Sequence, residues 1–181
     1  GNAMVRLNSI SIDLRQRYER EAANQYAINQ RLRITMDRYE QIKQLIAANE
    51  DVVNFAEFGN GVSQEWIDKA EAALGFPLPP SYKWWLRNYG GGDIGGDEIT
   101  CIYEHGFDTP MGQDVVSRYR RCEDEGCLPL CDSDIDADFW FDLTADVPDH
   151  EYPVVSRALD GVYATDFLDF LKKRIEIMHE T

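Results

Sequence analysis

The chain has 181 residues, 44% of them hydrophobic and 12% aromatic, so it can bury a core and lacks the composition of a disordered protein. Its formal net charge of −15 argues against direct binding to nucleic acid or to an anionic membrane, because both would be repelled. The sequence has no apolar run near the roughly 18 residues that span a bilayer and no signal-peptide pattern near its start, so we predict a cytoplasmic protein.

The N-terminal part of the chain is predicted to be helical. Residues 1–3 precede Met4 and are interpreted as residues left by cloning. Residues 4–50 contain neither glycine nor proline, and apolar side chains recur there at helical spacing. We therefore expect an N-terminal helical extension, with a break near residues 22–25. Its mixed charges suit either packing on the rest of the chain or self-association.

The negative charge is concentrated in the remainder of the chain, which we predict to be a domain over residues 51–181. Residues 1–50 carry 8 basic and 6 acidic residues, a net charge of +2. Residues 51–181 carry 10 basic and 27 acidic residues, a net charge of −17. Such a field speeds the encounter with a basic partner, although acidity that serves only solubility is an alternative.

Two helices are predicted at the start of this domain. Residues 59–61 (Gly-Asn-Gly) form a turn, and Ser63 then stands where a helix N-cap is expected. Gly75 follows this helix as its C-terminal stop. A second helix begins with proline near its first turn and ends at Gly90.

The rest of the domain is predicted to contain strands, with a short helix at residues 113–121. The predicted strands are residues 99–103, 128–130, 139–143, 154–156 and a short one at 162–163. Thr165 is expected to cap a final helix. Helices first, strands in the middle and a helix last indicate the α+β class and not a βαβ repeat.

Two stretches resemble known ligand-binding motifs, but the residues around them do not fit those motifs. Gly90, Gly92 and Gly95 match a dinucleotide-binding pattern, but that pattern should follow a strand, whereas here it follows a predicted helix. The alternating aspartates from residue 132 onward are typical of a calcium loop, yet Ala137 stands where the loop needs glycine and Leu143 where it needs glutamate. We predict neither a nucleotide site nor an EF-hand.

The cysteines and histidines give no catalytic or metal-binding pattern. The four cysteines are irregularly spaced, without C-x-x-C and without a histidine close in sequence to three of them, so reduced thiols are favoured over zinc ligands or disulfides. None of the three histidines neighbours a serine or cysteine in a nucleophile motif. We predict no catalytic residue, no metal and no cofactor.

The acidic, aromatic stretch from residue 132 to residue 142 is the candidate partner-binding site. If residues 138–143 form a strand, Phe139, Phe141 and Leu143 lie on one face of it. Asp138, Trp140 and Asp142 then lie on the other face. An aromatic anchor among charges is typical of a protein interface. The alternative is that Trp140 lies under a helix. The candidate contacts are Asp132, Asp134, Asp136, Asp138, Trp140 and Asp142.

Several motifs together resemble the SUKH superfamily over about residues 63–175. The clearest is a run with the pattern Leu-Pro-x-x-Tyr-Lys followed by a double glycine, at residues 78–91. A Trp-x3-Ala-Glu-x2-Leu-Gly segment precedes it, and later segments occur in the order that the family has. These segments are residues 66–75, 128–130, 139–143, 153–155 and 165–171.

The resemblance implies an α+β fold with a mixed, mostly antiparallel sheet flanked by helices. It also implies membership of a group that includes fungal cell-wall regulators and bacterial immunity proteins. The immunity proteins are cytoplasmic and block toxins, often nucleases, by direct binding. No catalytic residues come with the family. The helical extension and an insert at about residues 104–126 depart from the family pattern.

Two functions remain open from the sequence. The first is an immunity protein whose acidic face binds a cognate toxin with a basic surface. Trp140, Asp138 and Asp142 would make the central contacts, and the aspartates at 132–136 would provide long-range attraction. The second is a regulatory scaffold or adaptor that oligomerises or recruits partners through its N-terminal helices. The sequence leaves the oligomeric state open.

Overall fold

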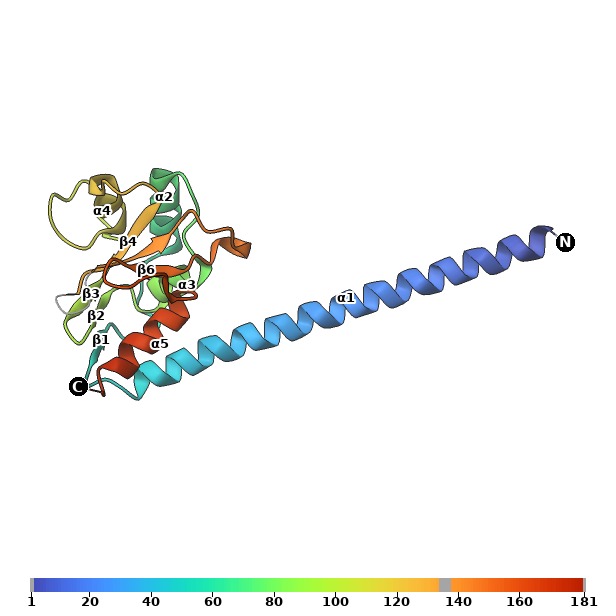
Figure 1. The fold of residues 1–181 in the computed structure, drawn as a ribbon, viewed down its shortest axis with the longest axis horizontal. Helices are drawn as coiled ribbons and strands as arrows, with labels where there is room; N and C mark the ends of the chain where they lie inside the picture. The colour runs from blue at the N-terminus through green and yellow to red at the C-terminus, as the bar shows by residue number, and fades with distance from the viewer. Residues whose placement is uncertain (1, 134–137, 181) are drawn as a thin grey trace. The chain divides into compact units, whose positions relative to one another are not determined.

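The computed structural model describes residues 2–133 and 138–180, and the chain divides into two compact units, Gly1–Gln41 and Ile42–Thr181. Helix α1 (Asn2–Ala47) forms the described part of the first unit and ends in the second (Figure 1). The break expected near residues 22–25 is wrong, because the helix is continuous there. Ion pairs one turn apart, Arg15–Glu19 at 3.2 Å and Arg17–Glu21 at 3.1 Å, support it just before that point.

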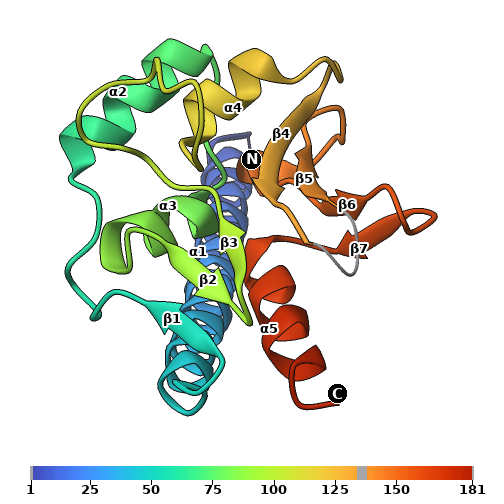
Figure 2. The same ribbon diagram turned by 90° about the vertical axis from the view of Figure 1, so that its left-hand side faces the viewer.

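The second unit contains a seven-stranded antiparallel sheet in which each strand pairs with its neighbours in sequence, so the order runs from β1 to β7 (Figure 2). The strands are β1 (Val53–Phe55), β2 (Gly92–Ile94), β3 (Asp97–Ile99), β4 (Cys127–Cys131), β5 (Phe139–Asp142), β6 (Val154–Ser156) and β7 (Val162–Ala164). Strands β1 and β7 are its edges. The predicted α+β class is confirmed.

Four helices complete this unit, together with a 3-10 turn at Pro148–His150. They are α2 (Gln64–Leu74), α3 (Pro80–Asn88), α4 (Val115–Arg121) and α5 (Phe167–Ile177). Ser63 caps α2 as predicted, since its Oγ accepts a hydrogen bond from the Trp66 amide at 3.4 Å. Gly75 ends the helix with φ +84°, a conformation that favours glycine. Helix α5 is capped by Asp166, not by Thr165 as predicted.

Helices α3 and α5 cover the inner face of the sheet with aromatic side chains. Tyr82 of α3 lies 5.5 Å from the Phe141 ring of β5 and 5.3 Å from the Phe167 ring of α5, measured between ring centroids. All three side chains are fully buried. The Tyr82 hydroxyl donates a hydrogen bond to the Thr100 carbonyl at 2.7 Å, so its polar end is satisfied inside the core.

A buried ion pair joins α5 to β3. Arg174 is 1% exposed, and its Nη2 donates a hydrogen bond to the Asp97 carboxylate at 2.7 Å. The guanidinium also lies 5.0 Å from the centroid of the Phe139 ring. A charge buried this deeply depends on its partner, because desolvation alone is unfavourable.

Asp114 connects residues 104–126 to the segment that follows β3. This carboxylate is fully buried and accepts hydrogen bonds from the amides of Ser117 at 2.8 Å and Tyr103 at 3.0 Å. It thereby caps α4, the helix predicted at residues 113–121. A parallel bridge between Cys101 and Asp114 extends the attachment to the backbone.

Candidate functional site

The candidate site lies on the outer face of strands β4 to β7. Along β5, Phe139 and Phe141 are buried, whereas Trp140 and Asp142 are half-buried. Trp140 lies directly opposite Pro129 of β4 and Val155 of β6, so these side chains share one face of the sheet. We call this surface, formed by Pro129, Trp140, Asp142, Val155 and Val162, the outer face.

Trp140 lies beneath an arginine. The Arg157 guanidinium lies 5.0 Å from the centroid of the Trp140 ring and is paired with the Asp124 carboxylate. Its side chain remains 60% exposed, so the cation is available to solvent on its other side. Trp140 is therefore half-buried, with the Arg157 guanidinium over one face of its ring.

The predicted aspartates differ in what they do. Asp132 forms an ion pair with Arg118 of α4 at 2.6 Å, and Asp138 is exposed just before β5. The Asp142 Oδ1 accepts hydrogen bonds from the Thr144 amide at 2.9 Å and the Thr144 hydroxyl at 2.6 Å, so this side chain closes the turn after β5. Asp134 and Asp136 lie outside the described residues.

A groove of about 450 Å³ reaches the outer face from the α4 side. Its lining includes Pro129, the cross-strand neighbour of Trp140, together with Asp132 and two arginines, Arg118 and Arg121. The charged groups of this lining are therefore two guanidinium groups and one carboxylate. Sequence reasoning did not find these arginines, because they come from the insert and not from the acidic stretch.

The comparison with protein families gives one result. The family model described as SMI1-KNR4 cell-wall (SUKH_6) matches residues 64–171, which is more than half of the chain. The chain belongs to the SUKH family. The comparison with curated proteins finds no match. The matched segment contains the groove residues and all the residues of the outer face, including Trp140.

Membership of the SUKH family supports a module of the immunity type that binds other proteins, since members of the family are generally non-enzymatic immunity or regulatory proteins. The two most deeply buried thiols, Cys101 and Cys131, have the properties of structural cysteines. Burial raises the pKa of both Cys101 and Cys131 to about 12, so these thiols stay protonated near neutral pH. Within residues 2–133 and 138–180, we find no group of three His, Cys, Asp or Glu side chains that could hold a metal ion.

The histidines are engaged individually. His150 Nδ1 lies 3.0 Å from the Tyr152 hydroxyl, and His179 Nε2 is hydrogen-bonded to Asn49. The His105 ring lies 5.6 Å from the Tyr103 ring. Over the described part of the chain, no helix is both long and apolar enough to cross a membrane.

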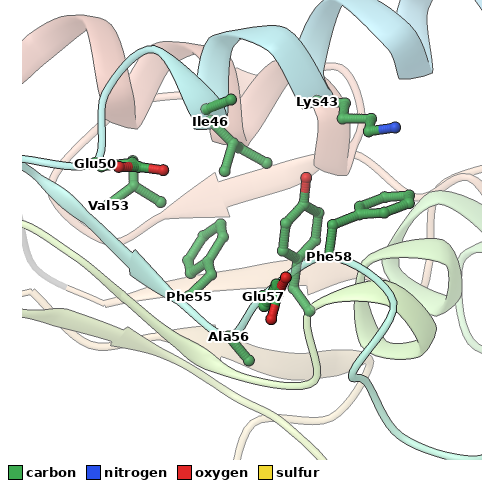
Figure 3. A pocket seen from close by; sticks show the side chains of 10 residues that line it. Lys43, Ile46, Glu50, Val53, Phe55, Ala56, Glu57 and Phe58 are labelled. Carbon is green, nitrogen blue, oxygen red and sulfur yellow. The ribbon is translucent and has the colours of Figure 1, made fainter.

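A second hollow, of about 430 Å³, lies beside the edge strand β1 (Figure 3). Phe55 and Phe58 form its walls, Phe55 packing on the buried Trp85 ring at 5.3 Å. Lys43 lies over the Phe58 ring, with its Nζ 4.2 Å from the ring centroid. Of the ten lining residues, only Tyr89 falls inside the SUKH match, so this pocket belongs to the part of the chain that precedes the family segment.

Proposed function

We propose that this SUKH protein is an immunity protein that neutralises a cognate toxin by direct binding through the outer face, with Trp140 at the centre of the contact. The observation that carries the proposal is the position of Trp140. It is half-buried, and it lies on the face of the sheet opposite to the buried Phe139 and Phe141. Tryptophan and arginine dominate the energies of protein interfaces, and here Arg157 lies on Trp140 itself. The proposed site residues are Asp132, Asp134, Asp136, Asp138, Trp140 and Asp142.

The net charge of this chain indicates what kind of surface the partner should have. The predicted domain at residues 51–181 carries a net charge of −17, which favours a toxin with a basic surface and a fast, salt-sensitive encounter. The arginines near the groove would then pair with acidic groups at specific points of the same surface. A cytoplasmic location follows from this role, because the toxin has to be met inside the cell that carries both proteins.

The test is co-expression with the protein encoded immediately upstream, scored by growth rescue and by pull-down. We expect rescue and a complex with the wild-type chain, and at least about tenfold weaker binding with Trp140→Ala. The matched control is Trp66→Ala, a half-buried tryptophan on α2, which should bind as the wild type does. Absence of both rescue and complex would overturn the proposal.

The second candidate is a scaffold or adaptor that assembles through the helical extension, which we propose to span residues 4–50 ahead of a domain at 51–181. It is favoured by α1, where large apolar side chains remain exposed, among them Tyr18 at 74% and Ile34 at 64%. A mass measurement on the full chain over a range of concentrations tests it. A monomer at every concentration would exclude assembly of the chain with itself.

A further inference from the structure

Strand β1, at one edge of the sheet, directs backbone groups away from its only neighbour, β2. The Gly95 amide donates a hydrogen bond to the Val52 carbonyl at 2.7 Å, in line with the register of the β1–β2 ladder. In an antiparallel ladder, hydrogen-bonded pairs alternate with pairs that make no hydrogen bond to each other. Asn54 is therefore the next residue that bonds to β2, and the amides and carbonyls of Val53 and Phe55 point to the open side of the edge.

Most of these open backbone groups have no partner within the protein. The Val53 amide donates to the Asn49 carbonyl at 2.9 Å. Over residues 2–133 and 138–180, no hydrogen bond engages the Val53 carbonyl or the amide and carbonyl of Phe55. At the opposite edge of the sheet, the β6–β7 ladder contains a register shift, and the Tyr163 carbonyl accepts a hydrogen bond from Lys173 at 2.8 Å. Irregularities and lysines protect an edge from further pairing, so β1 is the edge that can accept another strand.

The hollow of about 430 Å³ beside β1, which we call the edge pocket, lies on the face of the strand that carries Val53 and Phe55 (Figure 3). Both residues line it, whereas Asn54 between them is exposed on the other face. Ile46 of α1 and Phe58 add apolar walls. Residues that lie opposite each other on paired strands point to the same face of a sheet. A strand added along β1 would therefore direct the side chain opposite Val53 or Phe55 towards the edge pocket.

The charges at the edge pocket favour a basic occupant. Glu50 just before β1 and Glu57 just after it both line the pocket and are exposed, so a carboxylate lies near each end of the open edge. The basic residue of the lining is Lys43, whose Nζ lies 4.2 Å from the centroid of the Phe58 ring. In the part of the chain that the structure describes, neither glutamate forms an ion pair with Lys43 or another cation. Both carboxylates are available to a partner, and an edge with a carboxylate at each end is not complementary to a second copy of itself.

We infer that β1 and the edge pocket bind an extended segment of a partner protein, in which a large apolar side chain is flanked by basic residues. The amides of this segment would donate to the Val53 and Phe55 carbonyls, and one of its carbonyls would accept from the Phe55 amide. The apolar side chain would enter the edge pocket, and the basic side chains would face Glu50 and Glu57. Strand β1 precedes the segment that matches the SUKH family. This interface is separate from the outer face and does not depend on the toxin proposal.

The test is a titration of labelled peptides of about nine residues with the full chain, followed by fluorescence anisotropy. The reference peptide has leucine at its centre and lysine near both ends. One comparison peptide replaces the lysines with glutamate, another replaces the central leucine with serine, and a third keeps the reference sequence with its central amides N-methylated, so that they cannot donate to β1. We expect the reference peptide to bind and the other three to bind at least about tenfold more weakly. Raising the salt concentration should weaken the reference peptide.

Reversing the two carboxylates tests whether the contact is local. Glu50→Lys combined with Glu57→Lys should weaken the reference peptide by about tenfold or more and strengthen the glutamate peptide. Glu123→Lys combined with Glu125→Lys is the matched control, because it makes the same change of charge at two exposed glutamates outside the edge pocket. This control should bind the reference peptide within about twofold of the wild type. Circular dichroism checks that both double variants keep the fold.

Three results would overturn the inference. The first is that the reference peptide does not bind, or binds no better than the glutamate or serine peptide. The second is undiminished binding of the N-methylated peptide, which would mean that the edge pocket takes a side chain without strand pairing. The third is an equal loss in the two double variants, which would mean that the overall charge of the protein attracts the peptide and not the carboxylates beside β1.

Discussion

The two faces of strands β4 to β7 differ in what they contact. On the inner face, Leu128, Phe141 and Val154 are cross-strand neighbours, and all three are fully buried against the helices. On the outer face, Trp140 is half-buried and Val162 is 58% exposed. Because the two sets alternate along the same strands, one short segment contributes a core side and the side that we propose for recognition. Substitutions on the two faces should therefore separate stability from binding.

The largest expected effect tests this separation directly. Phe141→Ala empties a fully buried aromatic site and should lower the free energy of unfolding by about 3–5 kcal/mol. Trp140→Ala, one residue away, should lower it by about 1 kcal/mol or less, since its ring is only half-buried. Urea denaturation followed by circular dichroism measures both. Equal losses for the two variants would mean that the outer face is part of the core.

The buried ion pair between Arg174 of α5 and Asp97 of β3 should also contribute to stability. Asp97→Ala would leave the Arg174 guanidinium, 1% exposed, without the carboxylate that it contacts at 2.7 Å. We expect a loss of about 3 kcal/mol in unfolding free energy, as is usual when one partner of a buried pair is removed. Glu98→Ala changes the adjacent, exposed carboxylate and should cost less than about 0.5 kcal/mol. Similar thermal midpoints for the two variants would contradict a structural role for the pair.

A pH dependence should follow from the buried thiol at the end of β4. Burial raises the pKa of Cys131 from its ordinary value of 9.0 to about 12, and Asp97 adds to the shift. A folded pKa above the unfolded one means that the protonated thiol stabilises the fold fully below about pH 9, and that this contribution is lost as the pH rises toward 12. Cys131→Ala should therefore flatten the fall in stability over this range. An unchanged slope in Cys131→Ala would contradict this origin of the pH dependence.

How much of this could be predicted depends on the length and regularity of each element. Strand β5 and its alternation were predictable, because Phe139 and Phe141 enclose Trp140 in a clear period of two. Strands β1 and β2 were missed, and β3 was placed too late, at residues 99–103. These strands have three residues each, and β2 begins at Gly92 with φ +133° among glycines that predict turns.

The arginines of the candidate site could not be predicted from the acidic stretch alone. Arg157 reaches Trp140 only because β6 pairs with β5 in the register that sets Val155 opposite Trp140. Arg157 is the first residue after β6, so this register brings it close to Trp140. Arg118 depends on how α4 packs against β4, a tertiary contact that sequence spacing does not specify. The acidic character was therefore visible in the sequence, whereas its partial neutralisation was not.

The smallest expected effects concern Asp142, which has a role in the turn as well as a charge on the outer face. Asp142→Asn keeps an oxygen that can accept the hydrogen bonds from Thr144, so the free energy of unfolding should change by less than about 0.5 kcal/mol. Asp142→Ala removes that acceptor and should cost about 1 kcal/mol. Both remove the same charge, so both should slow association with the toxin by about two- to threefold at low salt, as Asp138→Ala should too. Association rates that follow stability instead, with the alanine variant of Asp142 slow and the asparagine variant normal, would show that this carboxylate contributes through the turn and not through its charge.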